Sequence, residues 1–257
     1  MQNEAVHALF KNYSKENGMD IRFLGTGDGA RYFADFLQTA SYYVGDAPDM
    51  LLKKGNEAII IEHFEFDSYS VSRKGSQGRQ EMARIKRRES SREAIEDDAL
   101  FSDEIKGESS FQNLITNLCR SFRKHYRHIS QYKENLEGYG LIDDSTQVKT
   151  MFLVEDISPL GSMVLDNDQN SAPRPLIVLL CDAFLDVFRD SSDVDFVLAC
   201  SSASSKDFMW FADRRDINEY YNHAVDYEKM TFLNFNVQVT GFRIVLPQDN
   251  VNDEQII

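Results

Sequence analysis

The sequence has few cysteines and no long hydrophobic run, and each shortage excludes a class of protein. Its three cysteines, Cys119, Cys181 and Cys200, stand far apart in apolar segments, unlike the close pairs of zinc sites or of secreted disulfide frameworks. We expect them to be core residues. No stretch approaches the roughly 18 apolar residues that indicate a membrane-spanning helix. The first ten residues also lack the basic end and apolar core of a signal peptide. We therefore expect a cytoplasmic protein without a membrane partner.

Basic residues are also scarce relative to acidic ones, which gives a formal net charge of −14 over 257 residues. This balance argues against a protein that coats nucleic acid by bulk attraction, although it allows a local basic track. The composition, 42% hydrophobic and 12% aromatic, is that of a globular chain. We expect one domain over residues 1–257, with its core in residues 1–201, a flexible segment at 93–110 and an extension at 202–257.

The periodicity of apolar residues predicts an α/β fold. Strands alternate with helices after a first hairpin, which is the order of α/β domains. The predicted helices cover residues 3–14, 111–137, 176–188 and 217–225, and the predicted strands cover residues 148–158 and 195–201. One hairpin is predicted at residues 49–67. A second is predicted near the C-terminal end of the sequence, with its turn near residues 240–241.

The most informative stretch is residues 47–67, APDMLLKKGNEAIIIEHFEFD. Two apolar runs flank a turn that contains Gly55 and Asn56, which predicts a hairpin. In that hairpin Asp49 at the start of one strand and Glu62 near the end of the next lie side by side, while His63 points to the opposite face as a packed histidine. A buried carboxylate needs a partner, and two adjacent carboxylates favour a hard divalent cation such as Mg²⁺ or Mn²⁺.

Basic residues are concentrated in two places on this acidic chain. The first is a segment directly after the hairpin, and the second is one face of the helix predicted at 111–137. Both are candidate phosphate contacts, which position a nucleic acid without reading its sequence. Equally, the first cluster could be a solvated helix that pairs with the acidic stretch 93–104. The candidate nucleic-acid-binding residues are Arg73, Arg79, Arg84, Arg87 and Arg88 in the segment and Arg120, Lys124 and Arg127 on the helix.

The pair Pro48-Asp49, a turn, Glu62 at the end of an isoleucine-rich strand, and a helix and strand after it resemble the motif of the PD-(D/E)xK nuclease superfamily. The resemblance implies a restriction-endonuclease-like mixed sheet flanked by helices, here with a basic helical insertion and a C-terminal α/β extension. It also implies Mg²⁺- or Mn²⁺-dependent cleavage of phosphodiester bonds in DNA or RNA, with DNA the expected partner. Asp49 and Glu62 would be the metal ligands.

The lysine of the family motif, two residues after the acid, is replaced by Phe64. The nearest lysine that could take its role is Lys74, so the catalytic set would be Asp49, Glu62 and Lys74. Without a lysine, the alternative is an inactive nuclease-like domain that binds nucleic acid or protein. Such a domain would act inside a larger defence or mobile-element assembly. For either function, the possible protein partners are a second copy of the chain in a homo-oligomer or the members of such a complex.

A further alternative comes from the loop Gly25–Ala30, whose G-x-G-x-x-A pattern follows an apolar tetrad and precedes a helix-like stretch. Asp46 follows at the distance of the ribose-binding acid in the dinucleotide-binding fingerprint. This interpretation predicts a nucleotide-binding enzyme and requires a second parallel strand at Ser41–Pro48, which is short and polar. A surface loop is the simpler interpretation.

Overall fold

The computed structural model describes residues 20–72, 75–78, 80–81, 83–84, 87, 109–158, 163–166, 174–175, 177–201, 208–226 and 230–232. The predicted helix at 3–14 and most of the segment 93–110 lie outside these residues. The same holds for the site candidates Arg73, Lys74, Arg79 and Arg88, and for all but the start of the predicted C-terminal hairpin.

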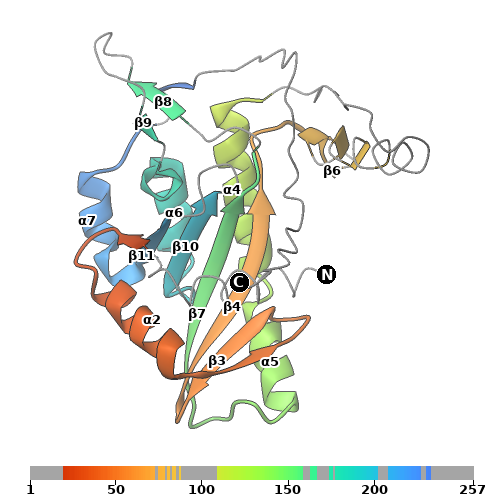
Figure 1. Ribbon diagram of the computed structural model, residues 1–257, viewed down its shortest axis with the longest axis vertical. Coiled ribbons are helices and arrows are strands. Elements are labelled where there is room, and N and C mark those ends of the chain that lie inside the picture. The colour runs from red at the N-terminus through yellow and green to blue at the C-terminus, as the bar shows by residue number, and fades with distance from the viewer. Residues whose placement is uncertain are drawn as a thin grey trace, which may run out of the picture.

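A seven-stranded mixed sheet forms the centre of the fold, in the order β1-β11-β10-β7-β4-β3-β2 (Figure 1). The strands β4, β7 and β10 are parallel, whereas β3 runs antiparallel to both of its neighbours. On the other side β11 is antiparallel to β10 and parallel to β1. The strands are β1 Asp20–Phe23, β2 Ser41–Val44, β3 Met50–Lys54, β4 Glu57–Phe66, β7 Gln147–Asp156, β10 Phe196–Ser201 and β11 Phe208–Asp213.

Shorter strands form two smaller sheets beside the central one. One has the order β12-β8-β9, and the other pairs β5 with β6 in the basic segment after β4. Their bounds are β5 Val71–Ser72, β6 Gly75–Ser76, β8 Met163–Asp166, β9 Arg174–Pro175 and β12 Met230–Phe232.

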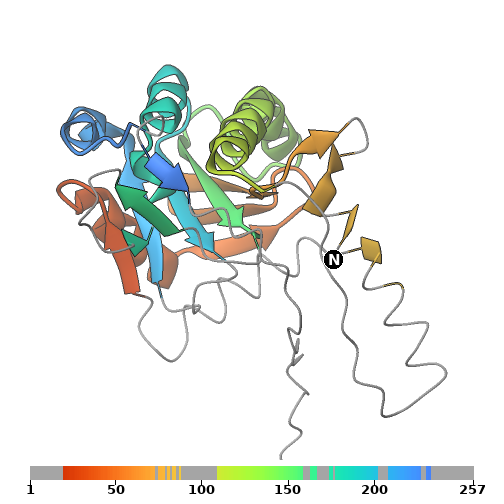
Figure 2. The same ribbon diagram turned by 90° about the horizontal axis from the view of Figure 1, so that it is seen from above.

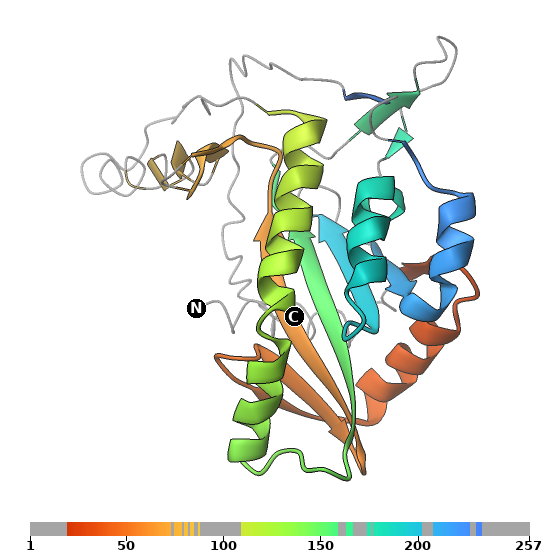
Figure 3. The same ribbon diagram turned by 180° about the vertical axis from the view of Figure 1, so that it is seen from behind.

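Helices cover both faces of the central sheet, so the predicted α/β class is confirmed. Among the described residues, α2 lies on one face, and α4, α5, α6 and α7 lie on the other, as the views from above and behind show (Figures 2 and 3). The helices are α2 Asp28–Thr39, α4 Phe111–Tyr126, α5 Ile129–Gly138, α6 Asp182–Asp190 and α7 Ile217–Asn222, with 3₁₀ turns at Val178–Leu180 and Arg214–Asp216. None of the helices in the described residues is long and apolar enough to cross a bilayer.

The predicted hairpin is present as β3 and β4, with Gly55 at φ 61° in its turn. The strand β4 is covered on both faces, as its run of isoleucines predicts. Ile60 and Phe64 pack in the core under α4 and α5, called here the α4–α5 face, while Ile59 and Ile61 pack under α2. Successive side chains of β4 therefore point alternately to the α4–α5 face and to the α2 face of the sheet.

The helix α4 owes its start and its position to local sequence. Ser110 is its N-cap, and its Oγ accepts a hydrogen bond from the backbone N–H of Asn113 at 3.0 Å. The predicted apolar stripe faces the sheet, with the Phe122 ring edge-on to Phe152 and Phe184. The prediction of one continuous helix over 111–137 is wrong, because the helix breaks at Arg127 and His128 and resumes as α5.

One further prediction differs from the structure, and two strand pairings were not predicted. The helix predicted from Leu176 begins only at Asp182, after a 3₁₀ turn. The sheet does not end with β10, because β11 from the predicted extension lies between β1 and β10 and buries Met209 and Phe211 under α2. The described start of the predicted C-terminal hairpin, β12, pairs with β8, and the rest of that hairpin lies outside the described residues.

Candidate functional site

The hairpin places Asp49 directly opposite Glu62. The antiparallel register pairs Met50 with Ile61, so one further step toward the start of β3 brings Asp49 beside Glu62 on the α4–α5 face. Each of these residues is only 7% exposed. The structure therefore brings together the two carboxylates that the sequence singles out.

Two residues from the helices bind one oxygen of Glu62. The Tyr132 hydroxyl lies 2.7 Å from Oε1, and the Nδ1 atom of His125 lies 2.8 Å from the same atom. The Tyr132 hydroxyl donates to this oxygen, and in the tautomer that carries a proton on Nδ1 the His125 ring donates to it as well. The other oxygen, Oε2, is buried and has no hydrogen-bond partner among the described residues.

Asp49 is held by the strand beside it. Its Oδ2 accepts a hydrogen bond from the backbone N–H of His63 at 2.8 Å, and no described residue donates to Oδ1. Burial, and then the nearby Glu62, raise the pKa of Asp49 to about 6, against the opposing effect of the His63 N–H. The loop before Asp49 is fixed by Asn135 of α5, whose side-chain amide donates to the Ala47 carbonyl at 2.9 Å.

Phe64, two residues after Glu62, belongs to the core. It is 3% exposed and packs edge-on against Phe122 and Phe152. Its ring stacks on His125, with centroids 4.7 Å apart and planes 13° from parallel. The nitrogen-bearing group next to Glu62 is thus an imidazole supported by Phe64. Lys74, the sequence candidate for this role, lies outside the described residues.

His63 lies on the α2 face of the sheet, as predicted. Its Nε2 is 3.0 Å from the Glu155 carboxylate, and its ring is buried with no partner for Nδ1 among the described residues. The residue contacts the carboxylate pair only through its backbone N–H. Its side chain is therefore part of the packing on the opposite face.

A second set of carboxylates lies at the carboxyl ends of β4 and β7, where it organises loops. Asp67 accepts hydrogen bonds from the Tyr69 N–H at 3.1 Å and from the Ser76 hydroxyl. Asn117 of α4 donates to the carbonyls of Asp67 and Tyr69 at 2.9 and 2.8 Å. These contacts attach the start of the basic segment to α4.

A metal ion on Asp49 and Glu62 would need further ligands. In the part of the chain that the structure describes, no three His, Cys, Asp or Glu side chains gather in a way that could hold a metal ion. Mg²⁺ suits such a pair, because it commonly binds through one or two carboxylates and takes its other ligands from water and phosphate oxygens. The chemistry of the two carboxylates therefore fits this ion.

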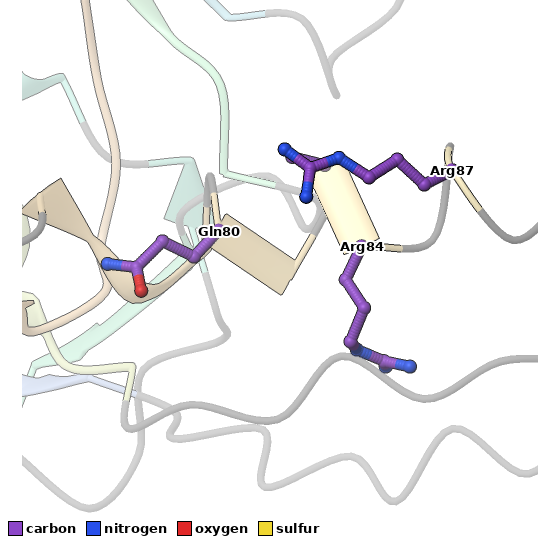
Figure 4. Close-up of a pocket in the computed structure, with 4 residues that line it drawn as sticks. Gln80, Arg84 and Arg87 are labelled. Carbon is purple, nitrogen blue, oxygen red and sulfur yellow. The ribbon is translucent and has the colours of Figure 1, made fainter.

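The described candidate cations fall in two places. Arg120 and Lys124 lie exposed on α4, and Arg127 lies exposed at its C-cap. The Arg120 guanidinium donates to the Asn117 side-chain oxygen at 2.9 Å. Arg84 and Arg87 line an open hollow of about 420 Å³ with Gln80 and Ala83 (Figure 4). The Arg84 guanidinium forms an ion pair with the carboxylate of Glu81, three residues earlier in the chain, at 2.8 Å.

The Gly25–Ala30 loop does not form a dinucleotide site of the predicted kind. The strands β1 and β2 lie at opposite edges of the sheet, so α2 does not join neighbouring parallel strands. The loop instead holds an internal carboxylate, because the N–H and hydroxyl of Thr26 donate to Asp216 at 3.0 and 2.9 Å. Asp213 lies so close to Gly29 that a Cβ there would be 2.1 Å from its carboxylate. These acidic groups disfavour a bound phosphate.

Sequence reasoning missed His125 and Tyr132. His125 lies among the basic residues of α4, so its sequence context suggests a surface position. Tyr132 lies between Ile129 and Leu136 in the apolar stripe of α5, so the pattern predicts a core residue. Only the position of both helices over β4 shows that they meet at Glu62.

Family models, curated proteins and solved structures were compared with the chain, and none of them matches it.

Proposed function

We propose that the protein is a metal-dependent nuclease that cleaves phosphodiester bonds in DNA or RNA, with Asp49 and Glu62 as ligands of Mg²⁺ or Mn²⁺. The observation that carries this proposal is the pair of facing, buried carboxylates in which Glu62 Oε2 has no hydrogen-bond partner among the described residues.

A divalent cation fits the electrostatics of the pair. The raised pKa of Asp49 shows that burial and the charge of Glu62 both disfavour a second negative charge here. Asp49 and Glu62 would hold such a cation, whose charge would offset this repulsion and the cost of burying a carboxylate without a partner.

The order of elements also supports the proposal. The hairpin of β3 and β4 is followed, after the short strands β5 and β6, by helices α4 and α5 and then by β7, which is parallel to β4 and adjacent to it. This is the helix and strand that the resemblance to the nuclease superfamily implies after the motif.

The chemistry divides between the ion and the chain. When bound, Mg²⁺ supplies acidification of water and neutralises charge on the phosphate oxygens. Asp49 and Glu62 would bind the ion. Arg120 and Lys124 on α4, with Arg127 at its C-cap, would hold the phosphates of the substrate.

A second candidate function is favoured by Phe64. With a core phenylalanine in place of the motif lysine, the same domain would bind nucleic acid without cleaving it, as an interaction module. The two candidates share the binding surface and differ only in the reaction.

Both are tested by incubating the protein with plasmid, linear and single-stranded DNA and with RNA, in Mg²⁺ or Mn²⁺ and then with chelator. The nuclease proposal expects metal-dependent cleavage that is lost in Asp49→Ala and Glu62→Ala and kept in Asp144→Ala, an exposed acid elsewhere. Cleavage that survives both site substitutions would contradict it. Salt-sensitive binding without cleavage would instead support the interaction module.

A further inference from the structure

Glu62 is bound asymmetrically by two side chains that lie outside the nuclease motif. Both His125 and Tyr132 bind Oε1, at 2.8 and 2.7 Å, and neither binds Oε2. Two donors on one oxygen fix both the position of that atom and the orientation of the carboxylate plane.

The two donors are themselves held in place. The His125 ring lies on the buried ring of Phe64 and is only 19% exposed in its side chain. Tyr132 is buried in the same core as the apolar stripe of α5. It reaches Glu62 from α5, the helix that follows the break at Arg127 and His128.

We propose that His125 and Tyr132 are positioning residues for the metal site: they bind Glu62 Oε1 and so reserve Oε2 for a divalent cation. This inference rests on the proposed function, since it assigns two further residues to the same site. Phe64 then has a definite role, because it supports from the strand the imidazole that α4 supplies. Partners that orient a metal ligand commonly change metal affinity by about 10- to 100-fold when they are removed.

The test measures Mn²⁺ binding to the metal-free full chain by electron paramagnetic resonance. We expect Tyr132→Phe, which removes only the hydroxyl, and His125→Ala each to weaken Mn²⁺ binding about 10- to 100-fold. His125→Asn keeps an N–H donor close to the position of Nδ1, so it should restore most of the lost affinity. His223→Asn, an exposed histidine at the end of α7, is the matched control and should bind as the parent protein does.

Cleavage assays add a second readout. If the two residues act through the metal, raising the Mn²⁺ concentration should restore the cleavage rate of Tyr132→Phe toward that of the parent protein. A loss of folded protein alone would lower the rate at every Mn²⁺ concentration, and thermal melting of each variant measures that loss.

The outcomes separate this inference from the proposed function. If the parent protein binds Mn²⁺ through Asp49 and Glu62 but Tyr132→Phe and His125→Ala bind it equally well, the positioning role is overturned and the nuclease proposal stands. If the parent protein neither binds Mn²⁺ at these carboxylates nor cleaves nucleic acid, both are overturned.

Discussion

Asp49 carries a pH dependence whose sign follows from its surroundings. Its pKa in the folded protein is about 6, whereas an unfolded aspartate has a pKa of about 3.9. The folded state therefore binds this proton more tightly. It loses stability relative to the unfolded state as pH rises from about 4 to about 6, and the loss persists above that range.

We expect Asp49→Asn, which keeps an acceptor for the His63 N–H, to be more stable than the parent protein above pH 6 in chelator. The difference in stability should vanish below about pH 4, where Asp49 is protonated in both the folded and the unfolded protein. Urea unfolding at pH 4 and pH 8 measures it, and Asp144→Asn, at an exposed position, is the control. A difference of the same size at both pH values would show that ionisation is not its cause.

Phe64 is a core residue as much as a feature of the site. Phe64→Ala removes contacts with two core rings and with the His125 ring, so the free energy of unfolding should fall by about 3–5 kcal/mol. Tyr139→Ala is the control at a side chain that is 76% exposed, and it should change this free energy by no more than about 0.5 kcal/mol. Chemical denaturation measures both, and a cost for Phe64→Ala near that of the control would refute the packing described here.

At the scale of elements, the two helices over β4 hold the site residues in place. The N-cap of α4 is the simplest point at which to weaken this support, because Ser110 Oγ bonds the Asn113 N–H. Ser110→Ala should cost about 1 kcal/mol. Ser130→Ala, an exposed serine in α5, is the matched control. Equal unfolding midpoints for the two variants would show that the cap contributes nothing.

The break between α4 and α5 belongs to the same scale. Apolar residues keep helical spacing through it, so the sequence predicts one helix. The break allows α5 to place Tyr132 on Glu62 and Asn135 on the Ala47 carbonyl. Periodicity reports which face of a helix is apolar, but it does not report where two helix axes diverge.

At the scale of the whole molecule, the acidic chain presents its described cations of α4 together on an exposed surface. If this surface holds phosphates, Lys124→Ala should weaken DNA binding by a similar factor for unrelated sequences. It should also make the slope of log K against log salt shallower by about 0.9. Lys54→Ala, whose ammonium pairs with Asp35 beside β3, is the control. Fluorescence anisotropy over a salt series measures both, and an unchanged slope for Lys124→Ala would exclude a phosphate contact there.

The sequence by itself determined the features that depend on neighbours along the chain. The alternation in Ile59–Phe66 and the Gly55-Asn56 turn specify the hairpin, and the hairpin register alone places Asp49 opposite Glu62. The cap and apolar stripe of α4 are likewise local, because a period of 3.6 or 2 residues defines the buried face of each element.

Only the tertiary structure decided how distant segments meet. It inserted β11 into the central sheet, paired β12 with β8, and separated β1 from β2, so that the Gly25–Ala30 loop binds Asp216. It also brought His125 and Tyr132 to one oxygen of Glu62. The physical reason is that strand order and helix placement depend on which apolar faces bury one another, and such pairings leave no period in the sequence.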